Sequence, residues 1–133
     1  MRKTALCVAL ASAVAFGTKA FAAEDTGARL YLNHCAACHG DDGEGTGPVA
    51  ASMRVTVPNL RALAQRNGGV FPADAVSAYV DGRTAKAAHG DRQMPIWGDV
   101  FKGADQDAPE RAVRRRIAAV VEFISALQYP QQP

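Results

Sequence analysis

The segment Cys35-Ala36-Ala37-Cys38-His39 constrains this chain more than any other part of its sequence. Two cysteines that are two residues apart and directly followed by a histidine occur in three kinds of site. These are a redox-active dithiol, part of a zinc site and an attachment point for haem. Each kind of site requires a different fold. The fold that the rest of the sequence predicts therefore distinguishes among the three.

The first 22 residues have the features of a secretory signal peptide. Met1-Arg2-Lys3 is positively charged, an apolar run extends over 5–16, and Ala20-Phe21-Ala22 fits the small-x-small pattern of a cleavage site. The run is shorter than the roughly 20 apolar residues that span a bilayer, although an uncleaved anchor is the alternative. We therefore expect a signal peptide at 1–22, a mature domain at 23–133, and a location in the periplasm without stable membrane insertion.

The charge of the mature domain gives no reason to expect nucleic acid as a partner. Loss of Arg2, Lys3 and Lys19 lowers the number of basic residues from 15 to 12 against 13 acidic ones, so the formal charge changes from +2 to −1. A nucleic-acid-binding domain would instead carry an excess of basic residues.

The mature domain keeps only one pair of cysteines, because Cys7 belongs to the expected signal peptide. A disulfide between Cys35 and Cys38 would close almost no loop and would constrain the unfolded chain very little. Structural cross-linking is therefore a poor explanation for this pair.

Capping and turn residues predict helices in the first half of the mature domain. Asp25 or Thr26 can cap a helix that runs into the CAACH segment, and Asn59 can cap a short helix over 60–66. Between them, the glycines and the closing proline of 40–48 exclude regular structure.

Hydrophobic spacing predicts helices in the second half as well. A helix is expected over 72–81, a long loop over 83–106, and a final helix that begins where Asp107 and Glu110 have capping-box spacing. The apolar face of this last helix is formed by Val113, Ile117, Val120, Val121, Ile124 and Leu127. No segment alternates as a strand, so the predicted class is all-α. Such a chain has a thin core of its own, and we expect a bound group to fill its middle.

Covalently attached haem is the group that suits the CAACH segment best. On a helix, Cys35, Cys38 and His39 stand at positions i, i+3 and i+4 and reach the same side. The two sulfurs can then form thioethers to the vinyl groups, and the imidazole can ligate the iron while its other ring nitrogen is satisfied by a carbonyl.

The two other kinds of site find less support. A thiol–disulfide oxidoreductase places its cysteines on a βαβ framework, and no strand is expected before Cys35. A zinc site needs further ligands, and the remaining histidines, His34 and His89, do not have paired ligand spacing. We expect His34 to face away from the side that holds the two cysteines and His39.

Four features in order over 25–128 resemble class I c-type cytochromes as a whole. They are Gly27-x-x-x-Tyr31-x-x-x-Cys35, His39-Gly40 followed by Gly47-Pro48, Met94-Pro95, and the C-terminal helix with Phe123 and Leu127. More narrowly, the segments GGVFP (68–72), DGR (81–83), HG (89–90) and MPIWG (94–98) together resemble a bacterial subgroup of small cytochromes with one haem. The resemblance implies N- and C-terminal helices packed together, with short helices and long loops around one haem c. It also implies that the carbonyl of Pro48 accepts a hydrogen bond from His39.

Met94 is the expected sixth ligand of the haem iron, opposite His39. The following proline favours an extended conformation, so a loop presents this side chain, and the 55 positions from His39 allow the chain to cross to the other haem face. Ordinary core packing is the alternative reading of a methionine, and Met53 and His89 are the other candidate ligands.

Four further residues are expected at the haem, although each also has an ordinary structural reading. Leu60 and Tyr79 are predicted to touch the ring, Trp97 to line its edge and donate its indole N–H to a propionate, and Arg83 to pair with a propionate. The basic run Arg114-Arg115-Arg116 is either a solvated helix face or a docking site for a partner.

Histidine and methionine ligands fill both axial positions of the iron, which favours outer-sphere electron transfer over substrate chemistry. The predicted function is a periplasmic electron carrier and not an enzyme. It would be a free shuttle or the cytochrome subunit of a dehydrogenase or oxidase, a monomer or part of a complex, with redox proteins as partners. Only Lys86 and Lys102 remain after cleavage, so docking through a ring of lysines is not expected. The alternative is a haem enzyme or gas-binding protein with an open or displaceable distal ligand.

Overall fold

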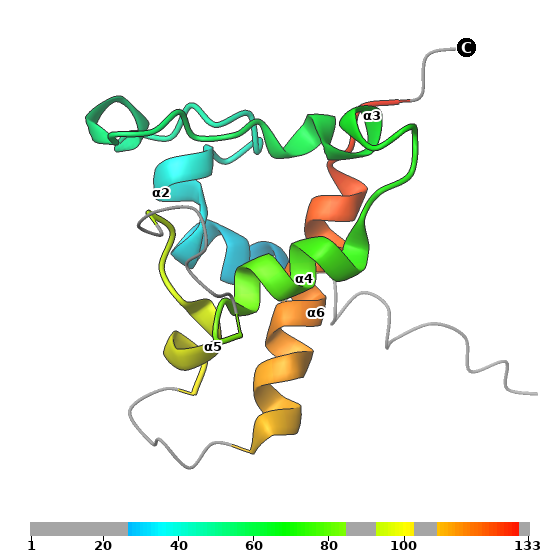
Figure 1. Ribbon diagram of the computed structural model, residues 1–133. Helices are drawn as coiled ribbons and strands as arrows, with labels where there is room; N and C mark the ends of the chain where they lie inside the picture. The colour runs from blue at the N-terminus through cyan, green and yellow to red at the C-terminus, as the bar shows by residue number, and fades with distance from the viewer. Residues whose placement is uncertain (1–26, 85–92, 103–108, 131–133) are drawn as a thin grey trace, which may run out of the picture.

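The computed structural model describes residues 27–84, 93–102 and 109–130. Within these ranges the regular structure is helical and no residue forms a strand, which confirms the all-α prediction (Figure 1). Residues 27–34 are helical and are followed by α2 (Ala36–His39), η1 (Ala50–Ser52), η2 (Leu60–Ala62), α3 (Leu63–Arg66), α4 (Ala73–Asp81), α5 (Trp97–Val100) and α6 (Glu110–Ala126). Asp25, Thr26, His89 and Asp107, to which the sequence assigned roles, lie outside the described residues.

The N-terminal helix at 27–34 packs against α6, as the family resemblance implied. A Cβ atom at Gly27 would overlap with the carbonyl of Ala119 and would lie 3.2 Å from the Cβ of Phe123. Four residues later, the buried ring of Tyr31 lies 5.0 Å from the ring of Phe123, centroid to centroid. Glycine therefore allows the two backbones to approach each other, and the aromatic pair fills the space beside them.

Replacing Gly27 by alanine tests this close approach. We expect Gly27→Ala to lower the free energy of unfolding by about 1–3 kcal/mol, because the new methyl group forces the two helices apart. An unstrained helical site would instead gain stability from the same change, since alanine is the better helix former. Thermal or chemical unfolding of the two proteins measures the difference. Ala118→Gly, on the exposed side of α6, shows the cost of helix propensity alone, about 1 kcal/mol.

Two predicted helix boundaries agree with the structure. The side chain of Asn59 accepts a hydrogen bond from the backbone N–H of Arg61 at 2.9 Å and so caps η2. Gly82 adopts the left-handed conformation at the end of α4, where other residues would be strained. Helix α4 lies across α6, and Val80 of α4 joins Val113, Ile117, Val120 and Ile124 of α6 in the core.

The long loop predicted over 83–106 is interrupted by a helix. Residues Trp97–Val100 form α5, which packs on both α4 and α6. A helix of four residues is too short to display the periodicity on which the prediction depended, and contact with the rest of the fold stabilises it.

Arg83 does not have the position predicted for it. Its guanidinium group forms ion pairs with Asp81, from Nε to Oδ1 at 2.6 Å, and with Glu110, from Nη2 to Oε1 at 2.7 Å. The turn at Gly82 brings the arginine back over the end of α4, and it does not line the cavity described below. The predicted pairing of Arg83 with a propionate therefore finds no support in the contacts that this residue makes.

Because of these ion pairs, the free energy of unfolding is expected to depend on pH. Hydrogen bonds from Arg83 lower the pKa of both Asp81 and Glu110 below the usual carboxyl range. A group with a lowered folded-state pKa contributes stability that is present above its unfolded pKa and lost as the pH falls through the folded value. We expect the stability difference between the native protein and Arg83→Gln to be full at neutral pH and to decrease as the pH falls below the ordinary carboxyl pKa of about 4, measured by chemical unfolding from pH 7 to pH 3. A difference that does not depend on pH would contradict this assignment.

Candidate functional site

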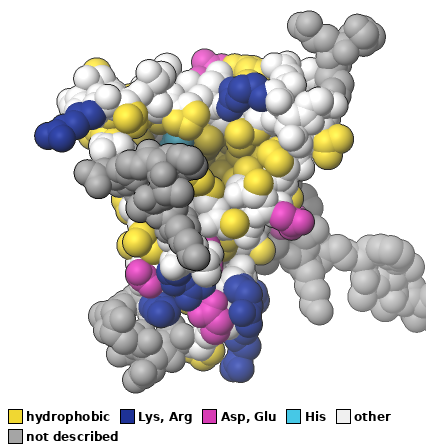
Figure 2. Space-filling model, viewed as in Figure 1, with side chains coloured by type: hydrophobic (Ala, Val, Ile, Leu, Met, Phe, Trp, Pro, Cys, Tyr) yellow, Lys and Arg dark blue, Asp and Glu magenta, His cyan; other side chains and the backbone are white. Residues whose placement is uncertain are grey.

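A cavity of about 530 Å³ lies between α2, the η2–α3 segment, α4 and residues 93–97. Figure 2 shows it as a hollow surrounded by hydrophobic side chains, while charged side chains gather below it, over α5 and the start of α6. Apolar residues from all of these elements except α2 line it, among them Leu60, Leu63, Val76 and Trp97. The space therefore suits a large and mainly apolar group.

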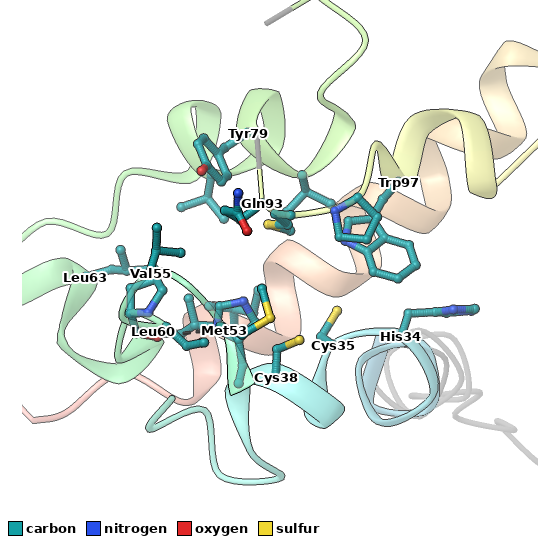
Figure 3. Close-up of a pocket in the computed structure, with 18 of the residues that line it drawn as sticks. His34, Cys35, Cys38, Met53, Val55, Leu60, Leu63, Tyr79, Gln93 and Trp97 are labelled. Atoms are coloured by element: carbon teal, nitrogen blue, oxygen red, sulfur yellow. Dashed lines mark hydrogen bonds between the residues drawn. The ribbon is translucent and has the colours of Figure 1, made fainter. Parts of the chain in front are cut away.

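Cys35, Cys38 and His39 all line this cavity, and Figure 3 shows the two cysteines together on one side of it. Cys35 continues the N-terminal helix through a bond from its N–H to the carbonyl of Tyr31 at 2.8 Å, and the N–H of His39 reaches the carbonyl of Cys35 at 2.9 Å. The helical spacing thus places both thiols and the imidazole on the same side, as the sequence predicted.

The carbonyl that faces the His39 ring belongs to Pro58 and not to Pro48. Nδ1 of His39 lies 3.3 Å from the oxygen of Pro58, whereas Pro48 is exposed and does not line the cavity. The predicted partnership of Pro48 with His39 is therefore wrong. A donor hydrogen on Nδ1 fixes the tautomer of the ring and leaves Nε2 able to ligate a metal.

The glycine-rich loop after α2 explains why the later proline takes this role. The N–H groups of Gly45 and Gly47 bond to the carbonyls of His39 and Cys38, at 2.7 Å and 3.1 Å, so the loop folds back beneath the end of α2. A Cβ atom at Gly45 would lie 2.6 Å from the carbonyl oxygen of Val57 and 3.2 Å from that of Pro58. The segment containing Pro58 thus packs directly on this loop, beside His39.

Burial changes the pKa values of His39 and Cys35. It lowers the pKa of His39, while the bond to Pro58 opposes that shift, so the imidazole is neutral at physiological pH and suited to be a ligand. Burial, together with neighbouring Cys38, raises the pKa of the Cys35 thiol to about 12. Redox-active dithiols depend on a lowered thiol pKa, so this environment argues against a thiol–disulfide oxidoreductase.

The opposite wall is formed by α4 and the segment before α5. Tyr79, Gln93 and Trp97 face the two cysteines across the cavity in Figure 3. Met94, which follows Gln93, also lines the cavity, and so does Met53 from the loop after η1. The structure thus brings both candidate methionines to the cavity.

His34 does not face away as expected. It lines the edge of the cavity and packs against Trp97 and Phe101, with ring centroids 5.3 Å and 5.4 Å away. Trp97 belongs to α5 and Phe101 directly follows this helix, which the sequence did not reveal, and this explains the error.

The residues present fit a covalently bound haem. The cavity offers two thiols and a neutral imidazole on one side, sulfur ligands elsewhere in its lining, and apolar walls for the macrocycle. Zinc finds no such support, because the described part of the chain contains no group of three histidine, cysteine or acidic side chains that could hold a metal ion.

Several lining residues were not singled out from the sequence, namely Val57, Pro58, Leu63, Pro72 and Ala75. The helical spacing that pointed to Leu60 also points to Leu63, one turn later. Nothing in the sequence marks Pro58, because its position depends on how two loops pack.

Comparison with known proteins agrees with this geometry. The family model for Cytochrome c matches residues 24–128, while no curated protein and no solved structure gives a significant match. None of the helices in the described ranges is long and apolar enough to cross a membrane. From its matched sequence and the residues gathered at its cavity, the chain belongs to the cytochrome c family and binds haem c covalently.

Proposed function

We propose that this protein is a periplasmic electron carrier whose haem iron is held between His39 and Met94. The observation that carries the proposal is that both residues line one cavity, in which Gln93, the neighbour of Met94, lies opposite Cys38, the neighbour of His39 (Figure 3). When bound, haem c supplies a one-electron couple between ferric and ferrous iron. With both axial positions filled by the chain, no substrate needs to reach the iron, and outer-sphere transfer is favoured.

The segment around Met94 supports its role as the distal ligand. Gln93 and Trp97 flank it and lie opposite Cys35 and Cys38 (Figure 3), and Pro95 favours an extended conformation at Met94. Met53 is the less suitable candidate, because it follows η1 directly and η1 packs on α2, the helix that carries His39.

The other residues of the cavity keep the site dry and its ligands in place. Pro58 holds the imidazole of His39 in one tautomer, and the apolar walls lower the local dielectric constant. Such an environment changes little between the ferric and ferrous states, which keeps the reorganisation energy of electron transfer small.

The mouth of the cavity supports an apolar docking surface for redox proteins. Tyr79 and Val55 both line the cavity and remain 59 % and 49 % exposed. With few lysines in the mature domain, contact with a donor or acceptor would depend more on such residues than on a ring of positive charge. The signal-peptide features of 1–22 support the periplasm as the place where these partners meet.

The proposal is tested by expressing the full chain with a haem-attachment system and fractionating the cells. We expect one haem per chain in the periplasmic fraction, a chain shortened at its N-terminus, and a reversible one-electron titration. Turnover of peroxide by the purified protein, or retention of the protein in the cytoplasm, would contradict the proposal.

A further inference from the structure

The position of Met94 depends on α5, which begins three residues after it. The N–H groups of Asp99 and Val100 bond to the carbonyl of Ile96 at 3.2 Å and 3.3 Å, so the helical hydrogen bonding already includes that residue. Between Ile96 and Met94 stands only Pro95, whose ring fixes one backbone angle. A displacement of α5 would therefore displace Met94.

The internal hydrogen bonds of helix α5 are too few to stabilise it alone. It has four residues, which is far too short for a helix to be stable alone, and Ile96, Asp99 and Val100 are all exposed. The apolar contacts come from Trp97 and Phe101, which pack on each other and on His34. The position of Met94 therefore depends on the contacts that other elements make with this short helix.

Arg116 of α6 fixes the C-terminal end of α5. Its Nη1 donates a hydrogen bond to the carbonyl of Phe101 at 2.5 Å. The N–H of Phe101 in turn donates to the carbonyl of Trp97, and the side chain of Phe101 is only 3 % exposed. A charged donor on the carbonyl at the end of a helix is favourable both as a hydrogen bond and through the helix dipole.

The ion pair of Arg83 fixes the middle of α5. Gly98 is buried, and a Cβ atom there would overlap with Oδ1 of Asp81 and Nε of Arg83 and would lie 2.8 Å from Cδ of the arginine. The backbone of α5 thus lies directly on this pair. Further bonds from Nη2 of Arg83 to Asp81 and from Nη1 to Glu110, at 2.7 Å and 2.8 Å, hold the guanidinium plane in place.

We propose that Arg83 and Arg116 are positioning residues for the distal ligand, and that their contacts with α5 set the fraction of time for which Met94 is presented to the iron. This inference rests on the proposed role of Met94. The two arginines act through α5, Arg83 through Gly98 and Arg116 through Phe101. They need not touch the haem.

Imidazole binding to the ferric protein measures the fraction of molecules in which Met94 has left the iron. The added imidazole can reach the iron only when Met94 has left it, so its apparent dissociation constant is the intrinsic one divided by the fraction of open molecules. We expect Arg116→Gln to bind imidazole roughly five- to tenfold more tightly than the native protein, and Arg83→Gln and Gly98→Ala at least as much. Arg116→Lys, which keeps a charged donor, should recover most of the native behaviour.

Two control variants separate positioning from general loss of stability. Arg115→Gln removes the neighbouring arginine of α6, and we expect no change in imidazole affinity. Tyr129→Phe removes two hydrogen bonds far from α5 in the fold, the one that the Tyr129 hydroxyl donates to Glu44 at 2.8 Å and the one that it accepts from Asn59 at 3.3 Å (Figure 1). It should lower the unfolding temperature without raising imidazole affinity.

The possible results distinguish the two proposals. If the native ferric protein shows the charge-transfer band of a sulfur ligand but Arg116→Gln and Arg83→Gln bind imidazole no more tightly than Tyr129→Phe, the positioning role is wrong while the ligand stands. If Met94→Ala leaves that band in place, the ligand assignment itself is wrong. Should Arg83→Gln or Gly98→Ala fail to fold, the comparison of Arg116→Gln, Arg116→Lys and Arg115→Gln still decides.

Discussion

The double variant Cys35→Ala/Cys38→Ala is expected to lose covalent haem and, with it, the cooperative thermal transition of the native protein. The cavity measures about 530 Å³, and at about 24 cal/mol per Å³ an unfilled space of that size would cost on the order of 10 kcal/mol. Water entering the open mouth reduces this figure. As an upper limit, it is comparable to the whole stability of a small domain, about 5–15 kcal/mol.

Two measurements check this result. After denaturation and acid–acetone extraction, haem should stay with the native chain and leave the double variant. Circular dichroism against temperature should show a sharp transition only in the native protein. Cys7→Ala, in the expected signal peptide, is the matched control and should behave as native. A native-like transition in the haem-free double variant would show that the chain has a sufficient core of its own.

The second large effect is expected at Met94. Met94→Ala should abolish the weak charge-transfer band of sulfur-bound ferric haem and allow carbon monoxide to bind the ferrous protein. Met94→His should keep six ligands on the iron but lower its potential. A thioether favours ferrous iron more than a second imidazole does, and we expect a shift on the order of 0.1–0.3 V within the roughly 0.8 V that axial ligands span.

Met53→Leu is the matched control for these variants, because it removes the other methionine that lines the cavity. We expect it to keep the band, the potential and the resistance to carbon monoxide. If Met53→Leu instead had the effects expected of Met94→Ala, the distal ligand would lie on the η1 side of the cavity. If neither variant changed the spectrum, His89 would become the candidate.

The parts of the fold that the sequence predicted are those set by local patterns. Helical spacing predicted the grouping of Cys35, Cys38 and His39 and the apolar face of α6, and single capping residues such as Asn59 marked helix boundaries. The packing of Gly27 and Tyr31 on α6 followed from the family resemblance. The grouping in the CAACH segment, the apolar face of α6 and the Asn59 cap depend on spacing that can be read along one element, whereas the packing of Gly27 and Tyr31 joins two separate helices.

The errors concern contacts between segments that are distant in the sequence. Pro48 follows the glycine-rich loop in sequence, but the carbonyl beside His39 belongs to Pro58, because the segment before η2 packs onto Gly45. Arg83 was expected at a propionate, yet the turn at Gly82 directs it to two carboxylates, one of them 27 positions away. Such positions depend on how distant segments pack together, and the hydrophobic periodicity of a single segment does not predict this packing.

We propose that the iron of this protein exchanges electrons while His39 and Met94 both stay bound to it. The most direct test is to oxidise the ferrous native protein with an outer-sphere reagent in a stopped-flow spectrometer, with and without saturating carbon monoxide. We predict identical rates and an unchanged ferrous spectrum under carbon monoxide. A shifted spectrum together with slowed oxidation would mean that the gas reaches an open iron, and that the protein binds ligands there instead of only carrying electrons.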